Sequence, residues 1–194
     1  KLGYEVKTIK HAESGRSFLS KGLLDQAKGI AIENVNLFSP LVNANSPLVG
    51  IEPSAILGFR DEYPDLVEKA DKKKADDLAS CTYTLEEFLS NELEKGNIHP
   101  DAFTKNQQLI KLHGHCHQKA LSSMIPSKKI LGLPTNYKEE LIPSGCCGMA
   151  GSFGYEEEHY EISMNIGDLV LIQTIERQSS DVIIAAAGTS SRHQ

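Results

Sequence analysis

The sequence predicts an α/β protein in which a largely parallel sheet is covered by helices. Short apolar, β-branched runs alternate with segments in which apolar residues recur at helical spacing. Polar residues gather directly after several of the short runs, as they do at the carboxyl edge of parallel sheets. With 194 residues, 40% of them hydrophobic, the chain is long enough to bury the core of such a fold.

Several short runs have the composition of strands. The expected strands are 4–9, 47–52, 108–114, 139–143 and 181–187, with 78–83 as a further candidate. Strands separated by helices pair in parallel and are covered on both faces. The polar residues that follow 108–114 and 139–143 are therefore expected at one edge of the sheet.

Three longer segments have the pattern of helices: 21–35, 84–95 and 157–176. The second begins with Thr84 and Glu87 at the spacing of a capping box. In the third, four residues fall on one face of the predicted helix: Ile162, Ile166, Leu169 and Gln173.

A weak internal repeat divides the chain into halves of about 1–96 and 97–194. Each half reads as a turn, a helix, a strand and a short polar segment. In this alignment Ser14 corresponds to a cysteine of the 146–147 pair, and Ala55 corresponds to Ser191. The first half has no thiol at these positions, so we expect it to act as a scaffold.

Charge and cysteine content limit the partners and the compartment. A net charge of −6 argues against a nucleic-acid surface. No apolar run approaches the roughly 18 residues of a membrane-spanning helix. The four cysteines do not form a secreted disulfide framework, so we expect a cytoplasmic protein, with peripheral attachment to the inner face of the membrane left open. Because the chain starts at Lys1 without methionine, 1–194 is interpreted as one cysteine-rich domain excised from a longer chain.

Two short motifs carry the chemistry. "HGHCHQ" places three histidines, His113, His115 and His117, around Cys116, and "SGCCG" places Cys146 beside Cys147. Neighbouring Cα atoms lie about 3.8 Å apart, closer than a disulfide prefers, so a bond within the pair is not expected. Thiolate and imidazole groups suit zinc and iron–sulfur clusters.

The second motif is rich in glycine. Gly145, Gly148 and Gly151 would let the backbone bend closely around a cluster, and its N–H groups would favour anionic sulfur. A helix starting near Glu156 would add its positive end and lower the pKa of the thiols. Cys81 has no ligand neighbours and is expected to be a small buried hydrophobe. At least one of the three histidines is expected to serve only in hydrogen bonding.

"HGHCHQKAL" followed by "SGCCGMAGSFGYE" resembles the cysteine-rich (CCG) domain of FAD-linked oxidases of the D-lactate dehydrogenase and glycolate oxidase type, and of the heterodisulfide reductase B subunit. The resemblance extends to "ESGRSFLSKGLLDQA", "VGIEPSAILGFRDEYPDL" and "GTSSRHQ". It implies an electron-transfer domain of a 2-hydroxyacid dehydrogenase. It also implies an iron–sulfur cluster on Cys116, Cys146 and Cys147, with His115 or His117 as a ligand or close neighbour. The partner would be a flavin domain or subunit, which carries the FAD of the parent protein.

The sequence departs from the family pattern in three places, one of which is "ESGR", where two-copy relatives have an early "CCG". Relatives often have cysteine where this chain has Ala55 and Ser191, so the resemblance implies one site, in the second half, with a customary thiolate missing. Serine is a poor replacement for a soft ligand. A histidine could complete the site, or the cluster could be lost in air or replaced by zinc.

Two other interpretations stay open: a zinc-binding docking module without redox activity, and a metal-free thiol-redox site in which Cys146 or Cys147 bonds Cys116. The sequence contains no flavin domain and no CxxCxxC run, so we expect no substrate oxidation by the chain alone.

Overall fold

The computed structural model describes residues 2–194 and divides into two compact units, which meet in sequence between Phe88 and Leu89. The α/β class is confirmed: helices alternate with strands, and every strand pairing among residues 2–194 is parallel. The interpretation of the chain as one excised domain with two repeated halves stays a prediction.

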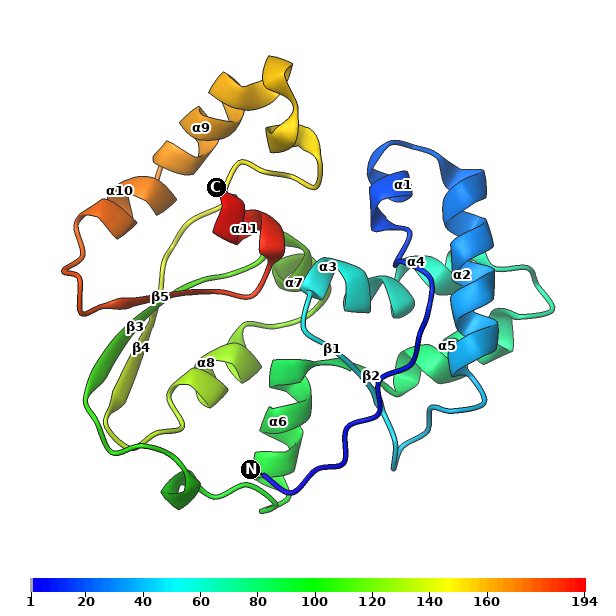
Figure 1. Ribbon diagram of the computed structural model, residues 1–194, viewed down its shortest axis with the longest axis horizontal. Coiled ribbons are helices and arrows are strands. Elements are labelled where there is room, and N and C mark those ends of the chain that lie inside the picture. Colours follow the sequence, from blue (N-terminus) through cyan, green and yellow to red (C-terminus); the bar gives the residue numbers. More distant parts are fainter. Residues whose placement is uncertain (1) are drawn as a thin grey trace. The chain divides into compact units, whose positions relative to one another are not determined.

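The first unit is mainly helical and has a two-stranded parallel sheet (Figure 1). Val49 of one strand lies opposite Tyr83 of the other. The elements are α1 (Arg16–Ser20), α2 (Leu24–Phe38), β1 (Leu48–Gly50), α3 (Pro53–Ile56), η1 (Leu57–Phe59), α4 (Glu62–Leu66), α5 (Lys72–Ser80), β2 (Thr82–Thr84) and the start of α6 (Leu85–Glu94).

The predicted capping box of α6 is confirmed. The backbone N–H of Thr84 donates to Glu87, and the N–H of Glu87 donates to the Thr84 hydroxyl at 3.2 Å. These two bonds satisfy backbone donors that have no partner within the helix, which explains why α6 begins directly after β2.

The core of the first unit contains a buried tyrosine. Tyr63 is 1% exposed and packs against Phe59, with ring centroids 4.4 Å apart. Its hydroxyl donates to the Ser14 carbonyl at 3.0 Å and accepts from the Asn34 amide at 2.9 Å. Burial raises the pKa of Tyr63 to about 12, although the bond from Asn34 opposes the rise.

This buried phenol predicts a loss of stability at alkaline pH. The pKa of Tyr63 is higher in the folded chain than its ordinary value of 10.0, so its contribution is complete below about pH 10 and is lost as the pH rises through 12. We expect the free energy of unfolding to fall by about 2–3 kcal/mol more in the wild type than in Tyr63→Phe over this range. Urea unfolding between pH 9 and 12 measures the difference, with Tyr160→Phe, at an exposed tyrosine, as the control. Parallel losses in the wild type and Tyr63→Phe would contradict the prediction.

The second unit contains a three-stranded parallel sheet in the order β4-β3-β5. Leu112 of the central strand lies opposite Leu141 on one side and Ala185 on the other. Figure 1 shows the strands side by side, with α11 following β5. The elements are η2 (Pro100–Ala102), β3 (Gln108–His113), α7 (Cys116–Leu121), α8 (Ile125–Leu131), β4 (Tyr137–Leu141), η3 (Phe153–Tyr155), η4 (Glu157–His159), α9 (Tyr160–Asp168), α10 (Leu171–Glu176), β5 (Ile183–Ala186) and α11 (Thr189–His193).

Most predicted strands coincide with observed ones, but two predictions need correction. The run 4–9 forms no strand: Val6 is 81% exposed, and Tyr4 packs edge-on against Phe88 instead of joining a sheet. The candidate 78–83 is half helix and half strand: 78–80 end α5, and β2 begins at Thr82, where it pairs with β1. In the run 4–9 the β-branched composition is present, but strand formation also needs a neighbouring strand with which to pair.

The predicted helix 157–176 is also corrected, because it breaks between α9 and α10. Ile162 and Leu169 of the predicted face are 52% and 74% exposed, whereas Ser163 and Gly167 are buried. Small residues are needed on this side, since a Cβ at Gly167 would lie 2.8 Å from the Cys147 carbonyl oxygen. The helix therefore presents its small residues to the cysteine turn.

Candidate functional site

Three loops meet at the carboxyl edge of the sheet in the second unit. The loop after β3 carries His115 and Cys116, the loop after β4 carries Cys146 and Cys147, and the loop after β5 leads to Ser191. Because β3 lies between β4 and β5, the carboxyl ends of all three strands are adjacent. The predicted convergence of the two cysteine motifs at one edge is thus observed.

Cys116 and Cys146 lie together. The Cys116 sulfur lies 3.7 Å from the carbonyl oxygen of Gly145, the residue before Cys146. Although Cys116 is exposed, partial desolvation of its sulfur raises the pKa of the thiol; Cys146 and Cys147 raise it further, while Lys119 lowers it. Desolvation and neighbouring sulfur outweigh the nearby positive charge. The lowered thiol pKa expected on the glycine turn, beside the helix near Glu156, stays a prediction.

Cys147 is 3% exposed and belongs to the core of this unit together with Ile142, Met149 and Leu171. The turn that holds it reverses sharply, since φ is +100° at Gly148, +39° at Ala150 and +70° at Gly151. The Gly148 N–H donates to the Cys146 sulfur at 3.3 Å. The expected bending at Gly148 and Gly151 is observed, and one backbone donor is already directed at sulfur.

The chain after β5 completes this edge. The Ser191 hydroxyl lies 3.6 Å from the Cys147 sulfur. It is held there by two contacts of the following residues: the Tyr155 hydroxyl lies 2.6 Å from His193 Nδ1, and the Ser163 hydroxyl donates to the Gln194 side chain at 3.2 Å. Position 191 is therefore next to Cys147.

The three histidines of the first motif differ in their surroundings. His115 is buried, and a Cβ at Gly188 would lie 2.0 Å from its Cδ2, so the loop after β5 runs directly against the ring. His113 is 1% exposed, and its Nδ1 lies 2.7 Å from the Ser144 hydroxyl. Burial lowers the pKa of His113 to about 4, with Lys119 and His115 acting in the same direction. His117 is half-buried in the first turn of α7, and its predicted role as a ligand stays a prediction.

The donor chemistry at this edge is soft. Three thiols lie at one edge of the sheet, and a backbone N–H points at one sulfur, which suits an iron–sulfur cluster or zinc. Within residues 2–194, no three His, Cys, Asp or Glu side chains form a group close enough to hold one metal ion.

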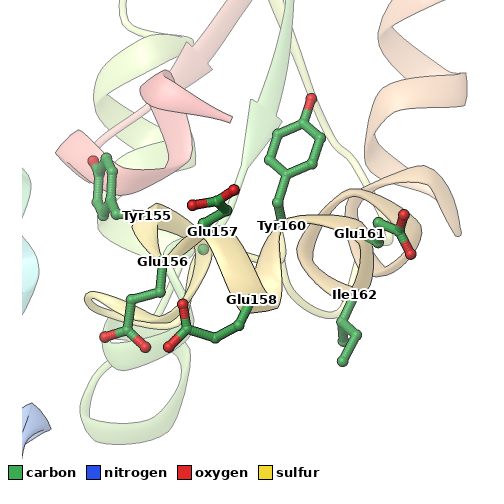
Figure 2. A pocket seen from close by; sticks show the side chains of 8 residues that line it. Tyr155, Glu156, Glu157, Glu158, Tyr160, Glu161 and Ile162 are labelled. Atoms are coloured by element: carbon green, nitrogen blue, oxygen red, sulfur yellow. The ribbon is translucent and has the colours of Figure 1, made fainter.

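Other features of the chain lie apart from the thiols. Cys81 is half-buried at the end of α5, where its sulfur lies 3.7 Å from the Ser80 hydroxyl. A pocket of about 490 Å³ is lined by residues 154–158 and 160–162, with no cysteine among them. In Figure 2 the side chains of Glu156 and Glu158 point to one side of the helical turns that line this pocket, and the side chain of Tyr160 points to the opposite side. Its carboxylates would repel the phosphates of a nucleic acid.

No family model matches the chain, and no solved structure matches it significantly. Two kinds of curated protein do match. The D-2-hydroxyglutarate dehydrogenase of Escherichia coli (strain K12) is 26% identical over 195 residues, which cover 100% of this chain and 18% of that protein. One subunit of the anaerobic glycerol-3-phosphate dehydrogenase of the same organism is 25% identical over 177 residues, which cover 90% of this chain and 43% of that subunit.

This chain is homologous to both proteins. The predicted resemblance to the cysteine-rich domain of FAD-linked dehydrogenases and oxidases is thereby confirmed. The chain spans less than half the length of each of these relatives. None of the helices described in residues 2–194 is long and apolar enough to cross a bilayer.

Proposed function

We propose that this chain is an electron-transfer domain that holds an iron–sulfur cluster through Cys116, Cys146 and Cys147. The parent protein would be an FAD-linked 2-hydroxyacid dehydrogenase or oxidase, with a flavin domain or subunit as the partner. The observation that carries the proposal is the meeting of the three loops after β3, β4 and β5, which brings the thiols and Ser191 to one edge. The homology to two dehydrogenase proteins supports it.

The residues around the thiols have distinct roles in this proposal. An iron–sulfur cluster supplies one-electron transfer when it is bound. Cys116 is exposed and Cys147 is buried, so the ligands span the boundary between solvent and core. The Gly148 N–H stabilises anionic sulfur on Cys146 through its hydrogen bond. His115, packed against Gly188, would be held in one orientation beside Cys116.

A metal-free thiol-redox site is the second candidate, because the Cys116 sulfur lies 3.7 Å from Gly145, the residue before Cys146, and the two thiols interact electrostatically. In that case the two thiols would form a disulfide as they lose two protons and two electrons to an oxidised partner. Analysis for iron and sulfide separates the two candidates, since only the cluster contains both.

We further propose that the two units are diverged copies. Gly15 and Gly148 both have positive φ, and each packs against a residue 15 positions later, Ile30 and Ser163 respectively. The same register pairs Ser14 with Cys147 and Asn34 with Gly167. Asn34 donates to the Glu13 carbonyl, one residue before Ser14, whereas Gly167 lies against the carbonyl of Cys147 itself. The matched glycine contacts therefore support the pairing of Ser14 with Cys147, and with it a first unit without a soft ligand.

Restoring a thiol at position 191 should strengthen the site. Ser191→Cys places sulfur where a hydroxyl now lies 3.6 Å from Cys147. After reconstitution with iron and sulfide without oxygen, we expect about threefold more bound iron and sulfide than in the unchanged chain, together with a broad visible absorption band. Purified in air, the unchanged chain is expected to fold without an intact cluster.

Ala55→Cys is the matched control, because Ala55 is the predicted counterpart of Ser191 in the first unit. It adds the same thiol, but the first unit has no cysteine at Ser14 to share a ligand with it. We expect no gain of iron from this change. Equal gains from both substitutions would mean that position 191 is not part of the site.

A further inference from the structure

We propose that Lys119 and His113 clamp the turn formed by Ser144 and Gly145, and thereby hold Cys146 against Cys116. This inference rests on the proposed function, because it concerns the positioning of the thiols of that site. It assigns a positioning role to both residues and ligation to neither.

Lys119 forms the first contact of the clamp. It follows Cys116 by three residues in α7, so both side chains lie on the same side of the helix. Its ammonium group donates to the Ser144 carbonyl at 3.0 Å and to the Gly145 carbonyl at 2.5 Å. Its methylene stem packs on Gly114, where an added Cβ would lie 3.1 Å from Lys119 Cδ. The stem is therefore held while the charged end reaches the turn.

His113 forms the second contact. It is the last residue of β3, and its Nδ1 lies 2.7 Å from the Ser144 hydroxyl. Ser144 is thus bound through its hydroxyl by the strand and through its carbonyl by α7. His113 and Lys119, which hold the turn, both belong to the segment 113–119, which also contains Cys116.

Packing fixes the turn only on its far side, where Cys147 is buried and Gly148 lies against α9. A Cβ added at Gly145 would meet no atom within 4 Å, so nothing packs on the side-chain direction of Gly145. The Gly145 carbonyl oxygen lies 3.7 Å from the Cys116 sulfur, and Cys146 follows directly. On this side of the turn, the polar contacts from Lys119 and His113 hold Cys146 near Cys116. Releasing them should allow the two sulfurs to separate.

The rate of disulfide formation between Cys116 and Cys146 tests the clamp without any metal. Diamide oxidises two neighbouring thiols to a disulfide and takes up the two electrons and two protons that they release. At a pH that ionises the thiols of both proteins, so that the charge of Lys119 no longer affects the thiolate fraction, we expect Lys119→Met to slow this bond about tenfold, because it removes both contacts of Lys119 to the turn. Lys119→Arg keeps the donors and should stay within about threefold of the wild type. Peptide mapping identifies the Cys116 to Cys146 bond and distinguishes it from bonds to Cys147.

Lys128→Met is the matched control, since it removes a lysine of α8 whose Nζ lies 3.9 Å from Glu139. Its disulfide rate should equal that of the wild type. Ser144→Ala provides a second test, because it removes the bond to His113 and leaves the carbonyl that accepts from Lys119; we expect it to slow the bond about threefold. An unchanged rate in both Lys119→Met and Ser144→Ala would overturn the clamp.

The two proposals fail in different ways. If the protein takes up no iron or sulfide, but Lys119→Met forms the disulfide more slowly than the wild type, the cluster function is lost and the clamp is kept. If the protein takes up the cluster, and both Lys119→Met and Ser144→Ala form the disulfide at the wild-type rate, the cluster function is kept and the clamp is lost.

Discussion

Gly148→Ala is expected to destabilise the second unit by roughly 3 kcal/mol or more and to displace both cysteines of the pair. At Gly148 φ is +100°, a conformation that L side chains rarely adopt, and an added Cβ would lie 2.1 Å from the Ser163 carbonyl oxygen. That atom is backbone of α9 and cannot rotate away. Either the turn or the helix must move, and the bond from the Gly148 N–H to Cys146 would be lost.

Gly145→Ala is the control within the same turn. A Cβ at that position meets no atom within 4 Å, and Gly145 is not among the positive-φ residues of the described chain. We expect its free energy of unfolding to stay within about 0.5 kcal/mol of the wild type. Urea unfolding followed by circular dichroism compares the two variants. Equal destabilisation would mean that the close approach of Gly148 to α9 does not determine the turn.

The strands of the second unit could be predicted because their composition favours strands and each of them has a neighbouring strand with which to pair. The runs 108–114, 139–143 and 181–187 overlap β3, β4 and β5, and the alternation of strands with helical segments correctly implied a parallel sheet. The run 4–9 has similar composition but no strand beside it, and a local pattern contains no information about pairing. The helix 157–176 was predicted as continuous because periodicity does not register the close contact between Gly167 and Cys147.

The candidate site could be predicted only in part. Cys116, Cys146 and Cys147 were identified because thiols that follow neighbouring parallel strands must meet at one edge. Lys119, Ser144 and Gly188 were not identified, since their roles depend on contacts between loops. Lys119 follows Cys116 by three residues on a helix. This spacing is the one sequence signal that could have indicated that its side chain points to the same side as Cys116.

The most direct test of the cluster proposal is the iron, sulfide and visible absorption of cysteine variants after reconstitution without oxygen. In the Ser191→Cys chain, each cysteine is replaced by serine in turn, with Cys81→Ser, from the first unit, as the matched control. We predict that loss of Cys116, Cys146 or Cys147 removes most of the absorption band and the bound iron, because serine is a poor ligand for iron in such clusters. Cys81→Ser should retain both. Equal iron and equal absorption in all four variants, or none in the Ser191→Cys chain itself, would contradict the assignment of the cluster to these three thiols.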